Sequence, residues 1–393
     1  MSDYFPEEII HKILLRLPVK PLIKFSLVCK SWMSLIKSST FIQSHLRTTI
    51  DSNDKNGTHL LLLSASSYSI TDRILHHHHW LRWDSPEFGE YSKLISPVVV
   101  NKKRVAFHDL RVVGTCNGLV CLESDNLYGH RSPTLLWNPS VRKTVIFPSP
   151  PMCFPGAVRH PKCITHGFGY DSHSGDYKIL RIATLFSSHL EVQVYSLARG
   201  SWKSLVINSV VAGDLKSGRE TLAFVNGSLH ILKSCTCLGD RLPDALPNLR
   251  GDNFITSFNL ATELFGQVMM PEALGKDGCS LSRYGDSLAL IKCRPAWDDP
   301  RGTDIWVMKE YGVAESWTFL FNIALVQVDI YGLKRCGEVV LRETNTDGES
   351  RTISLDPKSN EVKYFGTGGC DYYFMDSFVE SLVFLDHANA ISV

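Results

Sequence analysis

Two short motifs in the sequence contain side chains that could do chemistry. Gly285-Asp286-Ser287-Leu288 has the residue order of an esterase motif, in which the serine hydroxyl would be the nucleophile. Four consecutive histidines, His76 to His79, carry imidazole nitrogens that can bind a transition metal. However, Gly-Asp is also ordinary turn chemistry, and neighbouring side chains of one extended segment point apart, so the histidines cannot close a tetrahedral site alone. We therefore interpret the first motif as a hairpin turn and the second as a histidine-rich loop.

Two further candidates give no stronger indication of chemistry. Cys235-Thr236-Cys237 is too closely spaced for the usual zinc pair, and no partnering pair is evident. Asn101-Lys102-Lys103-Arg104 is a short basic run of the kind found in solvated loops, and the sequence has no phosphate-binding glycine motif. We predict no catalytic residue, no metal site and no cofactor, and we expect function to come from binding surfaces.

Composition and charge narrow the class of protein. The chain has 393 residues, 44% of them hydrophobic, which is enough for two folded domains. A formal net charge of +1 argues against a general nucleic-acid binder. The acidic N-terminus does not look like a secretory signal, and no apolar run reaches the roughly 18 residues of a membrane span. Eleven cysteines, an odd number scattered through apolar segments, indicate buried free thiols. We expect a protein of the cytoplasm, with the nucleus as a second compartment and with no membrane or nucleic-acid partner.

The elements that must position any binding surface begin with short helices. Apolar side chains recur every three to four residues between Ile9 and Leu17 and again between Leu22 and Ile36, and a last short turn begins at Phe41. Pro18 separates the two runs. A unit of about 45 residues cannot bury this much apolar surface by itself. It must therefore dock on a partner or on the chain's own C-terminal domain, and the pattern alone leaves both possibilities open.

The same segment carries a family resemblance. Phe5 to Ile10, Ile13 to Lys20 and Val28 to Trp32 stand at the spacing of a plant F-box, although Phe5 replaces the usual leucine. The resemblance implies a three-helix F-box domain at residues 1–50 that binds the Skp-type adaptor of an SCF ubiquitin ligase and, through it, a cullin-RING scaffold. It implies these adaptor contacts: Pro6, Ile9, Ile10, Ile13, Leu14, Leu17, Pro18, Val28, Trp32 and Leu35. Val28, Trp32 and Leu35 could equally hold the helices together.

The rest of the chain repeats with a period near 55 residues. Short alternating apolar runs are separated by turn glycines, as is typical of an all-β domain. The glycines recur in steps of 52 to 58 residues, and two-residue hairpin loops favour glycine because they need positive φ. A second hairpin follows each first one, so each period holds four strands, which is one propeller blade. The turn glycines are Gly118, Gly175, Gly227, Gly285 and Gly337.

Five blades account for residues 108–366, and half-blades remain at both ends. We predict a sixth blade that joins a tail hairpin, residues 372–374 with 381–385, to a second hairpin from residues 59–63 and 80–83. This arrangement would close the ring and hide the strand edges. The prediction is therefore an all-β propeller of six four-stranded blades after a small all-α unit. A stack of β-sandwiches is the alternative.

The repeats also carry a resemblance. Residues 116–121, 136–143, 166–171 and 194–203 are similar to phrases of the F-box-associated, kelch-like β-propeller domain of plant proteins. Within that family they resemble the S-locus F-box and S-locus F-box-like proteins of the rose family most, and residues 377–384 add to this likeness. The resemblance implies that residues 51–393 form a substrate-binding propeller. These phrases identify a fold and not a ligand.

Together the resemblances imply the non-catalytic, substrate-recognition subunit of an SCF-type ubiquitin ligase, which acts by proximity. The S-locus likeness implies a ribonuclease target in pollen self-incompatibility. Such ribonucleases are commonly basic, and residues 340–393 hold nine Asp and Glu against four Lys and Arg. The same adaptor role on an unrelated target in stress or developmental signalling is a second hypothesis. A propeller ligand-binding protein or enzyme with a vestigial F-box is a third.

Long inserts between strands are where we expect the target to bind, because loops on a rigid scaffold suit recognition. They fall at residues 148–155, 208–220, 234–253 and 292–299. The candidate target contacts within them are Phe154, Arg241, Arg250, Trp297 and Asp298.

Overall fold

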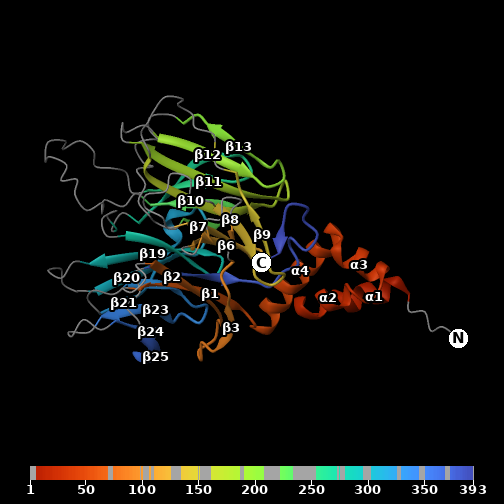
Figure 1. Cartoon of the computed structure of the whole chain (residues 1–393). Coiled ribbons are helices and arrows are strands. Elements are labelled where there is room, and N and C mark those ends of the chain that lie inside the picture. The colour runs from red at the N-terminus through yellow and green to blue at the C-terminus, as the bar shows by residue number, and fades with distance from the viewer. Residues whose placement is uncertain are drawn as a thin grey trace. The chain divides into compact units, whose positions relative to one another are not determined.

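A computed structural model gives the arrangement of most of the chain (Figure 1). Its contacts divide the chain into two compact units, Met1–Ser149 with Cys370–Val393, and Pro150–Gly369. The structure describes residues 6–69, 74–97, 99–100, 106–107, 110–124, 134–148, 150, 161–185, 190–207, 222–232, 254–271, 274, 279–294, 302–324, 329–344, 350–367 and 372–392.

The first unit begins with four helices, one more than the sequence predicts. The helices are α1 (Glu7–Leu14), α2 (Val19–Phe25), α3 (Lys30–Lys37) and α4 (Ser39–Asn56). The expected short turn at Phe41 is instead an 18-residue helix. The Ser38 hydroxyl accepts a hydrogen bond from the Phe41 backbone N–H and caps its start, and the helix ends only at the left-handed Gly57. In the part of the chain that is described, no helix is both long and apolar enough to cross a membrane.

Two larger sheets complete the first unit, and all of their strand pairs are antiparallel. One has the order β26-β1-β2-β3 and the other the order β27-β9-β8-β7-β6, while β4 and β5 form a separate pair. The bounds are β1 (Leu60–Ser69), β2 (Ile74–Trp83), β3 (Glu90–Leu94), β4 (Val99–Val100), β5 (Ala106–Phe107), β6 (Leu110–Cys116), β7 (Leu119–Ser124), β8 (Thr134–Asn138), β9 (Lys143–Ile146), β26 (Tyr372–Phe378) and β27 (Ile391–Ser392).

The second unit consists of four four-stranded sheets, each built from consecutive strands. Within this unit the first strands of successive sheets are in contact, β10 with β14, β14 with β18 and β18 with β22. A short 3₁₀ helix, η1 (Ala314–Ser316), precedes β21. The strand bounds are β10 (Pro161–Asp171), β11 (Asp176–Leu185), β12 (Leu190–Ser196), β13 (Ser201–Leu205), β14 (Ala223–Val225), β15 (Ser228–Ile231), β16 (Phe254–Asn259), β17 (Leu264–Met269), β18 (Cys279–Tyr284), β19 (Ser287–Arg294), β20 (Gly302–Met308), β21 (Trp317–Ile323), β22 (Asp329–Leu333), β23 (Val339–Thr344), β24 (Ser350–Asp356) and β25 (Glu361–Thr367).

The predicted fold class, a small helical unit followed by a six-bladed propeller of four-stranded sheets, is confirmed. Each predicted turn glycine has positive φ, from 58° at Gly285 to 93° at Gly337, and joins the first two strands of its sheet. At two of these turns the preceding asparagine also has positive φ, as the hairpin loop requires: Asn117 at 52° and Asn226 at 50°.

The composition of the sixth sheet differs from the prediction. Three N-terminal strands, β1 to β3, form this sheet with the single tail strand β26, which pairs with β1, so the sheet is three plus one and not two plus two. Residues 381–385 form turns where a second tail strand was expected. Residues 90–94 supply the missing strand, because β3 continues the N-terminal meander after β2. The last strand, β27, instead pairs with β9 and gives the neighbouring sheet a fifth strand.

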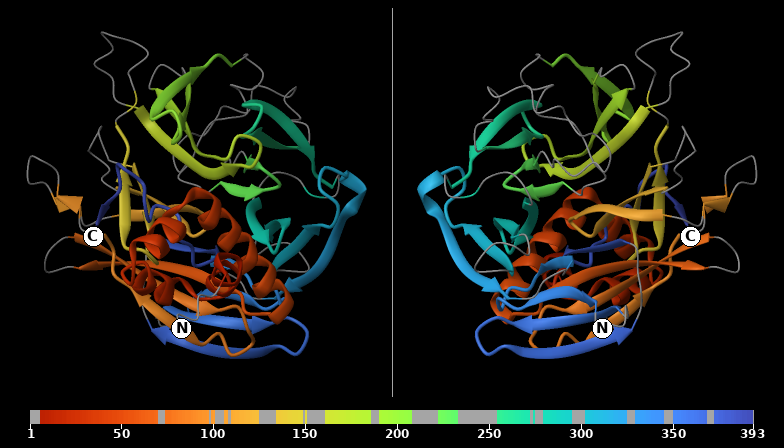
Figure 2. Two further views of the ribbon diagram at one scale, coloured as in Figure 1. Left: turned by 90° about the vertical axis from the view of Figure 1, so that its right-hand side faces the viewer. Right: turned by 90° about the vertical axis from the view of Figure 1, so that its left-hand side faces the viewer.

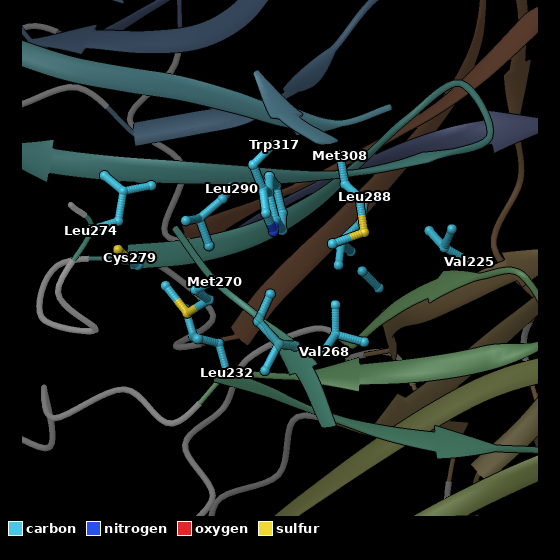
Figure 3. Close-up of a cluster of buried hydrophobic side chains, with 12 residues drawn as sticks. Val225, Leu232, Val268, Met270, Leu274, Cys279, Leu288, Leu290, Met308 and Trp317 are labelled. Atoms are coloured by element: carbon cyan, nitrogen blue, oxygen red, sulfur yellow. The ribbon is translucent and has the colours of Figure 1, made fainter. Parts of the chain in front are cut away.

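Hydrophobic cores fill the spaces between neighbouring sheets of one unit. Figure 3 shows the core between β14–β17 and β18–β21, in which Val268, Leu290 and Trp317 lie together and Val225 lies toward one side. Successive side chains of β19 point alternately into two such cores. Leu288 and Leu290 face this one, while Ala289 and Ile291 face the core shared with β22–β25. Each strand of this kind is therefore buried on both faces.

The structure settles the two motifs with which the sequence analysis began. Gly285-Asp286 forms the turn between β18 and β19, and the side chain of Asp286 is 84% exposed and bonded to Arg283, which confirms the turn. The histidine-rich loop is wrong, because His76 to His79 lie within strand β2, paired with β1. His77 and His79 are buried on one face of the sheet. No group of three or more potential metal ligands occurs among the residues that the structure describes.

The cysteines are less buried than predicted. Cys121 and Cys279 are core residues, but Cys29, Cys293 and Cys336 are exposed free thiols. Cys29 precedes α3, and Cys293 lies near the end of β19, beyond the buried residues Leu288–Ile291 of that strand, so both thiols lie outside the cores.

Burial strongly lowers the pKa of His79. Its side chain is fully buried, it packs 5.9 Å from the ring of Trp137, and neither ring nitrogen has a hydrogen-bond partner. Burial, with smaller contributions from His77 and His78, lowers its pKa to about 3. The folded protein therefore holds this imidazole neutral throughout the physiological range.

We predict that His79 makes the protein less stable in mild acid. Its pKa is about 3 when folded and about 6.5 when unfolded, so only the unfolded chain gains a proton as pH falls from 7.5 to 5.5. This difference lowers the free energy of unfolding by about 1.4 kcal/mol over that interval. Urea unfolding at both pH values should show this loss in wild type and in a control, His173→Gln, at an exposed turn. The loss should be smaller by that amount in His79→Gln, and equal losses in all three proteins would contradict the assignment.

Candidate functional site

The N-terminal helices expose a set of large apolar side chains. Ile9 and Ile13 lie one turn apart on α1 and are 42% and 52% exposed. Leu27 and Val28, in the turn between α2 and α3, are 82% and 63% exposed, and Met33 on α3 is 37% exposed. We call these five residues the apolar face. So much exposed apolar surface on one small unit marks an interaction site.

A groove lies on the same helices, with a volume of about 690 Å³. Its apolar lining comes from α1 and α3, and its charged lining comes mainly from the first turns of α1. It can therefore accept an apolar side chain of a partner and a polar group beside it. The lining residues are Glu7, Glu8, Ile10, His11, Lys12, Cys29, Ser31, Trp32 and Leu35.

The opposite side of the helices is buried within the chain itself. Leu14, Leu22 and Phe41 are at most 2% exposed, and they share one core with Leu382 and Leu385 from the C-terminal segment. Both possibilities left open by the sequence are therefore realised, each by a different side of the helices. The inward side packs on the chain's own C-terminal segment, and the outward side is the apolar face.

The structure divides the ten predicted adaptor contacts into three groups. Leu14 is a correction, because its side chain is only 2% exposed. It packs in the core with Leu382 and Leu385 and is not part of the surface. The exposed residues are Pro6, Ile9, Ile13, Pro18 and Val28, and the partly buried ones are Ile10, Leu17, Trp32 and Leu35.

Trp32 and Leu27 show what the sequence could and could not indicate. Trp32 holds the helices together, since its ring packs edge-on to Phe25 at 5.7 Å, and it also lines the groove. Leu27 and Met33 were not predicted as contacts, although both belong to the apolar face. Leu27 could have been found, because an apolar residue in a turn between two helices has little chance of burial in so small a unit.

Charge around the site is mixed, with cations in excess. Lys12, Arg16, Lys24 and Lys30 are exposed, whereas the exposed carboxylates at the start of α1 are Glu7 and Glu8. Such a surface favours a partner that is apolar at its centre and acidic around it. Cys29 adds a polar feature beside the groove: a contact with the Ser31 hydroxyl at 3.1 Å lowers the pKa of its thiol.

The predicted target contacts fall outside the described residues. Phe154, Arg241, Arg250, Trp297 and Asp298 all belong to segments that the structure does not describe. They stay predictions, and the apolar face is the candidate site that the structure supports.

Comparisons with known proteins match both parts of the chain. Residues 3–44 match the F-box domain family, and residues 87–376 match the F-box associated beta propeller domain family. The sequence is 28% identical to an F-box/kelch-repeat protein of Arabidopsis thaliana, over 81% of this chain and 79% of that one. It is 30% identical to F-box protein CPR1 of Arabidopsis thaliana, over 81% of this chain and 72% of that one. Among solved structures, TolB from Acinetobacter baumannii aligns with a TM-score of 0.44 and 11% identity, over 86% of this chain and 73% of that one.

We predict that the two sides of α1 respond differently to truncation. Leu14→Ala should lower the stability of the helices by about 2–5 kcal/mol, because it leaves a cavity in their shared core. Ile13→Ala, one residue away and 52% exposed, should change it by less than about 0.5 kcal/mol. Native-state hydrogen exchange of α1 to α3 in the full chain measures both changes. Similar losses in the two variants would contradict the division into an inward and an outward side.

Proposed function

The chain belongs to the F-box proteins with an F-box associated beta propeller domain, and on this premise we propose that it is the substrate-recognition subunit of an SCF-type ubiquitin ligase. The observation that carries the proposal is the apolar face, which stays exposed although the rest of the helical unit is well packed. In the proposed complex, α1 to α3 bind a Skp-type adaptor on a cullin-RING scaffold, and the propeller binds the target. The chain supplies proximity and no bond chemistry.

The size of the exposed groups fits a protein partner. Leu27 and Val28 are exposed enough that burying each on the adaptor would contribute on the order of 1–3 kcal/mol. The groove on the same helices offers a partly open place for an anchoring side chain. A vestigial helical unit is the weaker alternative, because without a partner these side chains would remain in water. We place the complex in the cytoplasm, with the nucleus as a second compartment.

For the target we propose two classes. A basic ribonuclease in pollen is supported by the S-locus likeness of the sequence and by its acidic C-terminal region. A target in stress or developmental signalling is the second class, because the two matched domain families fix a fold and not a target. Affinity capture with the full chain from pollen and from leaf extracts separates the two classes, since a basic ribonuclease enriched only from pollen favours the first.

We predict that charge in the apolar face abolishes adaptor binding. In Ile9→Asp/Ile13→Asp, two carboxylates would have to be buried at the interface, so affinity for a Skp-type adaptor should fall at least about 100-fold. The matched control is Ile50→Asp on α4, which replaces an isoleucine of similar exposure, 37%, outside the apolar face. Titration calorimetry with purified adaptor measures the affinities, and circular dichroism checks that each variant is folded.

Two outcomes would count against the proposal. A folded wild-type chain that does not bind the adaptor would remove the ligase role altogether. Equal loss of affinity in the double variant and in the control would place the adaptor contact elsewhere on the helices.

A further inference from the structure

Residues Val379–Ser392 run from the end of β26 to strand β27, beside β9 (Figures 1 and 2). We call this segment the strap. Before β27 it contains turns, closed by backbone hydrogen bonds such as Leu385 N–H to Leu382 C=O at 2.9 Å. Although it has so little regular structure, it is well buried: Ser381 and Leu382 are 0% exposed and Phe384 is 4% exposed.

One side of the strap is bound to the sheet β6–β9. The Asn138 side-chain amide, itself 0% exposed, donates to Ser381 C=O at 3.1 Å, to the Ser381 hydroxyl at 3.2 Å and to Val383 C=O at 2.7 Å. Lys143 Nζ donates to Leu385 C=O at 2.9 Å. The strap also passes so close to the turn glycine that a Cβ on Gly118 would lie 2.5 Å from Val379 O.

The other side of the strap is bound to the F-box helices. Leu382 and Leu385 complete the core that contains Leu14, Leu22 and Phe41. Charged residues on either side of these two leucines in the sequence make further contacts. Asp386 pairs with Lys37 of α3 at 3.6 Å. Glu380 accepts a hydrogen bond from Tyr91 of β3 at 3.2 Å, and the Lys20 ammonium of α2 lies 5.6 Å from the same tyrosine ring.

The backbone of the strap has a conformation that its surroundings must impose. Phe384 has φ of 74°, in the left-handed region that bulky residues rarely adopt. Its ring is buried and packs 5.2 Å from that of His387. Strain of this kind persists only where the neighbouring contacts outweigh it. The strap is therefore a fixed part of the first unit and not a loose tail.

From these contacts we propose that the strap is the joint between the adaptor-binding helices and the part of the chain that binds the target. It completes the F-box core and fixes the F-box helices on the sheet β6–β9. This inference rests on the proposed ligase function for its purpose, since a fixed joint holds the adaptor at a constant place relative to a target bound by the same unit. Asn138, in the motif Trp137-Asn138-Pro139, then has two roles. It closes its own turn, and by holding the strap it positions the F-box helices.

The repeat supplies a matched control for Asn138. Asn259 ends β16 as Asn138 ends β8, and the Oδ1 atom of each accepts turn N–H groups: Ser140 at 2.9 Å for Asn138, and Ala261 at 3.0 Å and Thr262 at 2.9 Å for Asn259. The Nδ2 atom of Asn259, however, donates locally, to the Ser228 hydroxyl at 3.4 Å. Changing asparagine to aspartate keeps the accepting oxygen in both and removes the donors to the strap only in Asn138→Asp.

The first test is hydrogen exchange, followed by mass spectrometry, on the full chain without adaptor. Asn138→Asp should speed amide exchange about tenfold or more, both in the strap and in α1 to α3, because lost donors release the segment that completes the helical core. Asn259→Asp should leave both regions unchanged. If exchange rises in the strap while α1 to α3 keep wild-type protection, the joint is refuted.

A second variant guards against general unfolding by a buried aspartate. Leu382→Ala/Leu385→Ala leaves Asn138 intact and should speed exchange in α1 to α3 while β10 to β25 keep their protection. Wild-type protection of α1 to α3 in this variant would equally overturn the proposal.

A reconstituted ligase then tests the purpose of the joint. The chain's own lysines serve as the acceptors of ubiquitin. Wild type should be modified at a restricted set of lysines, and Asn138→Asp at a wider set, because the F-box helices are no longer held in place. Equal patterns would refute the positioning role. If wild type does not bind the adaptor at all, the proposed function fails, while the exchange experiment still decides whether the strap holds the helices.

Discussion

The structure depends on one physical constraint, the excess of apolar surface on three short helices. Helices of seven or eight residues are marginal in water, so α1 to α3 exist only because their inward sides share a core. That core is incomplete without two leucines from the far end of the sequence, Leu382 and Leu385. The surface that remains outside, the apolar face, is then free to serve a partner.

The propeller solves a related problem by repetition. Each sheet is too thin to have a core of its own, so the alternating side chains of strands such as β19 fill the spaces on both of its faces. The sheet that contains both ends of the propeller, β26-β1-β2-β3, brings α4 and the strap to the same unit. The contact between the F-box helices and the strap is thus a consequence of how the chain pairs its first strand, β1, with β26.

How much could be predicted from the sequence depended on the range of the interactions. The turn glycines and the hairpins beside them followed from local rules of φ and alternation, and the break between the first two helices at Pro18 followed in the same way. The length of α4 was missed because only the capping residues Ser38 and Gly57 define it. The burial of Leu14 and the role of Asn138 were missed because they depend on contacts more than 200 residues apart in the sequence, as in the Asn138–Ser381 pair. No local pattern encodes such contacts. The third N-terminal strand was missed for another reason: Glu90–Leu94 pairs locally with β2, but it is mostly polar and none of its residues is fully buried.

The long stretch of sequence between the helices and the strap also has a consequence for biosynthesis. At about 10 residues per second, a ribosome needs roughly half a minute to add the chain that separates α4 from Leu382. During that time the F-box helices have emerged without the leucines that complete their core. A product of premature termination lacks both β26 and the strap, so it exposes unpaired strand edges and half-formed helices that chaperones and proteases recognise. Synthesis through Leu385 is thereby a condition for a complete core of the short helices.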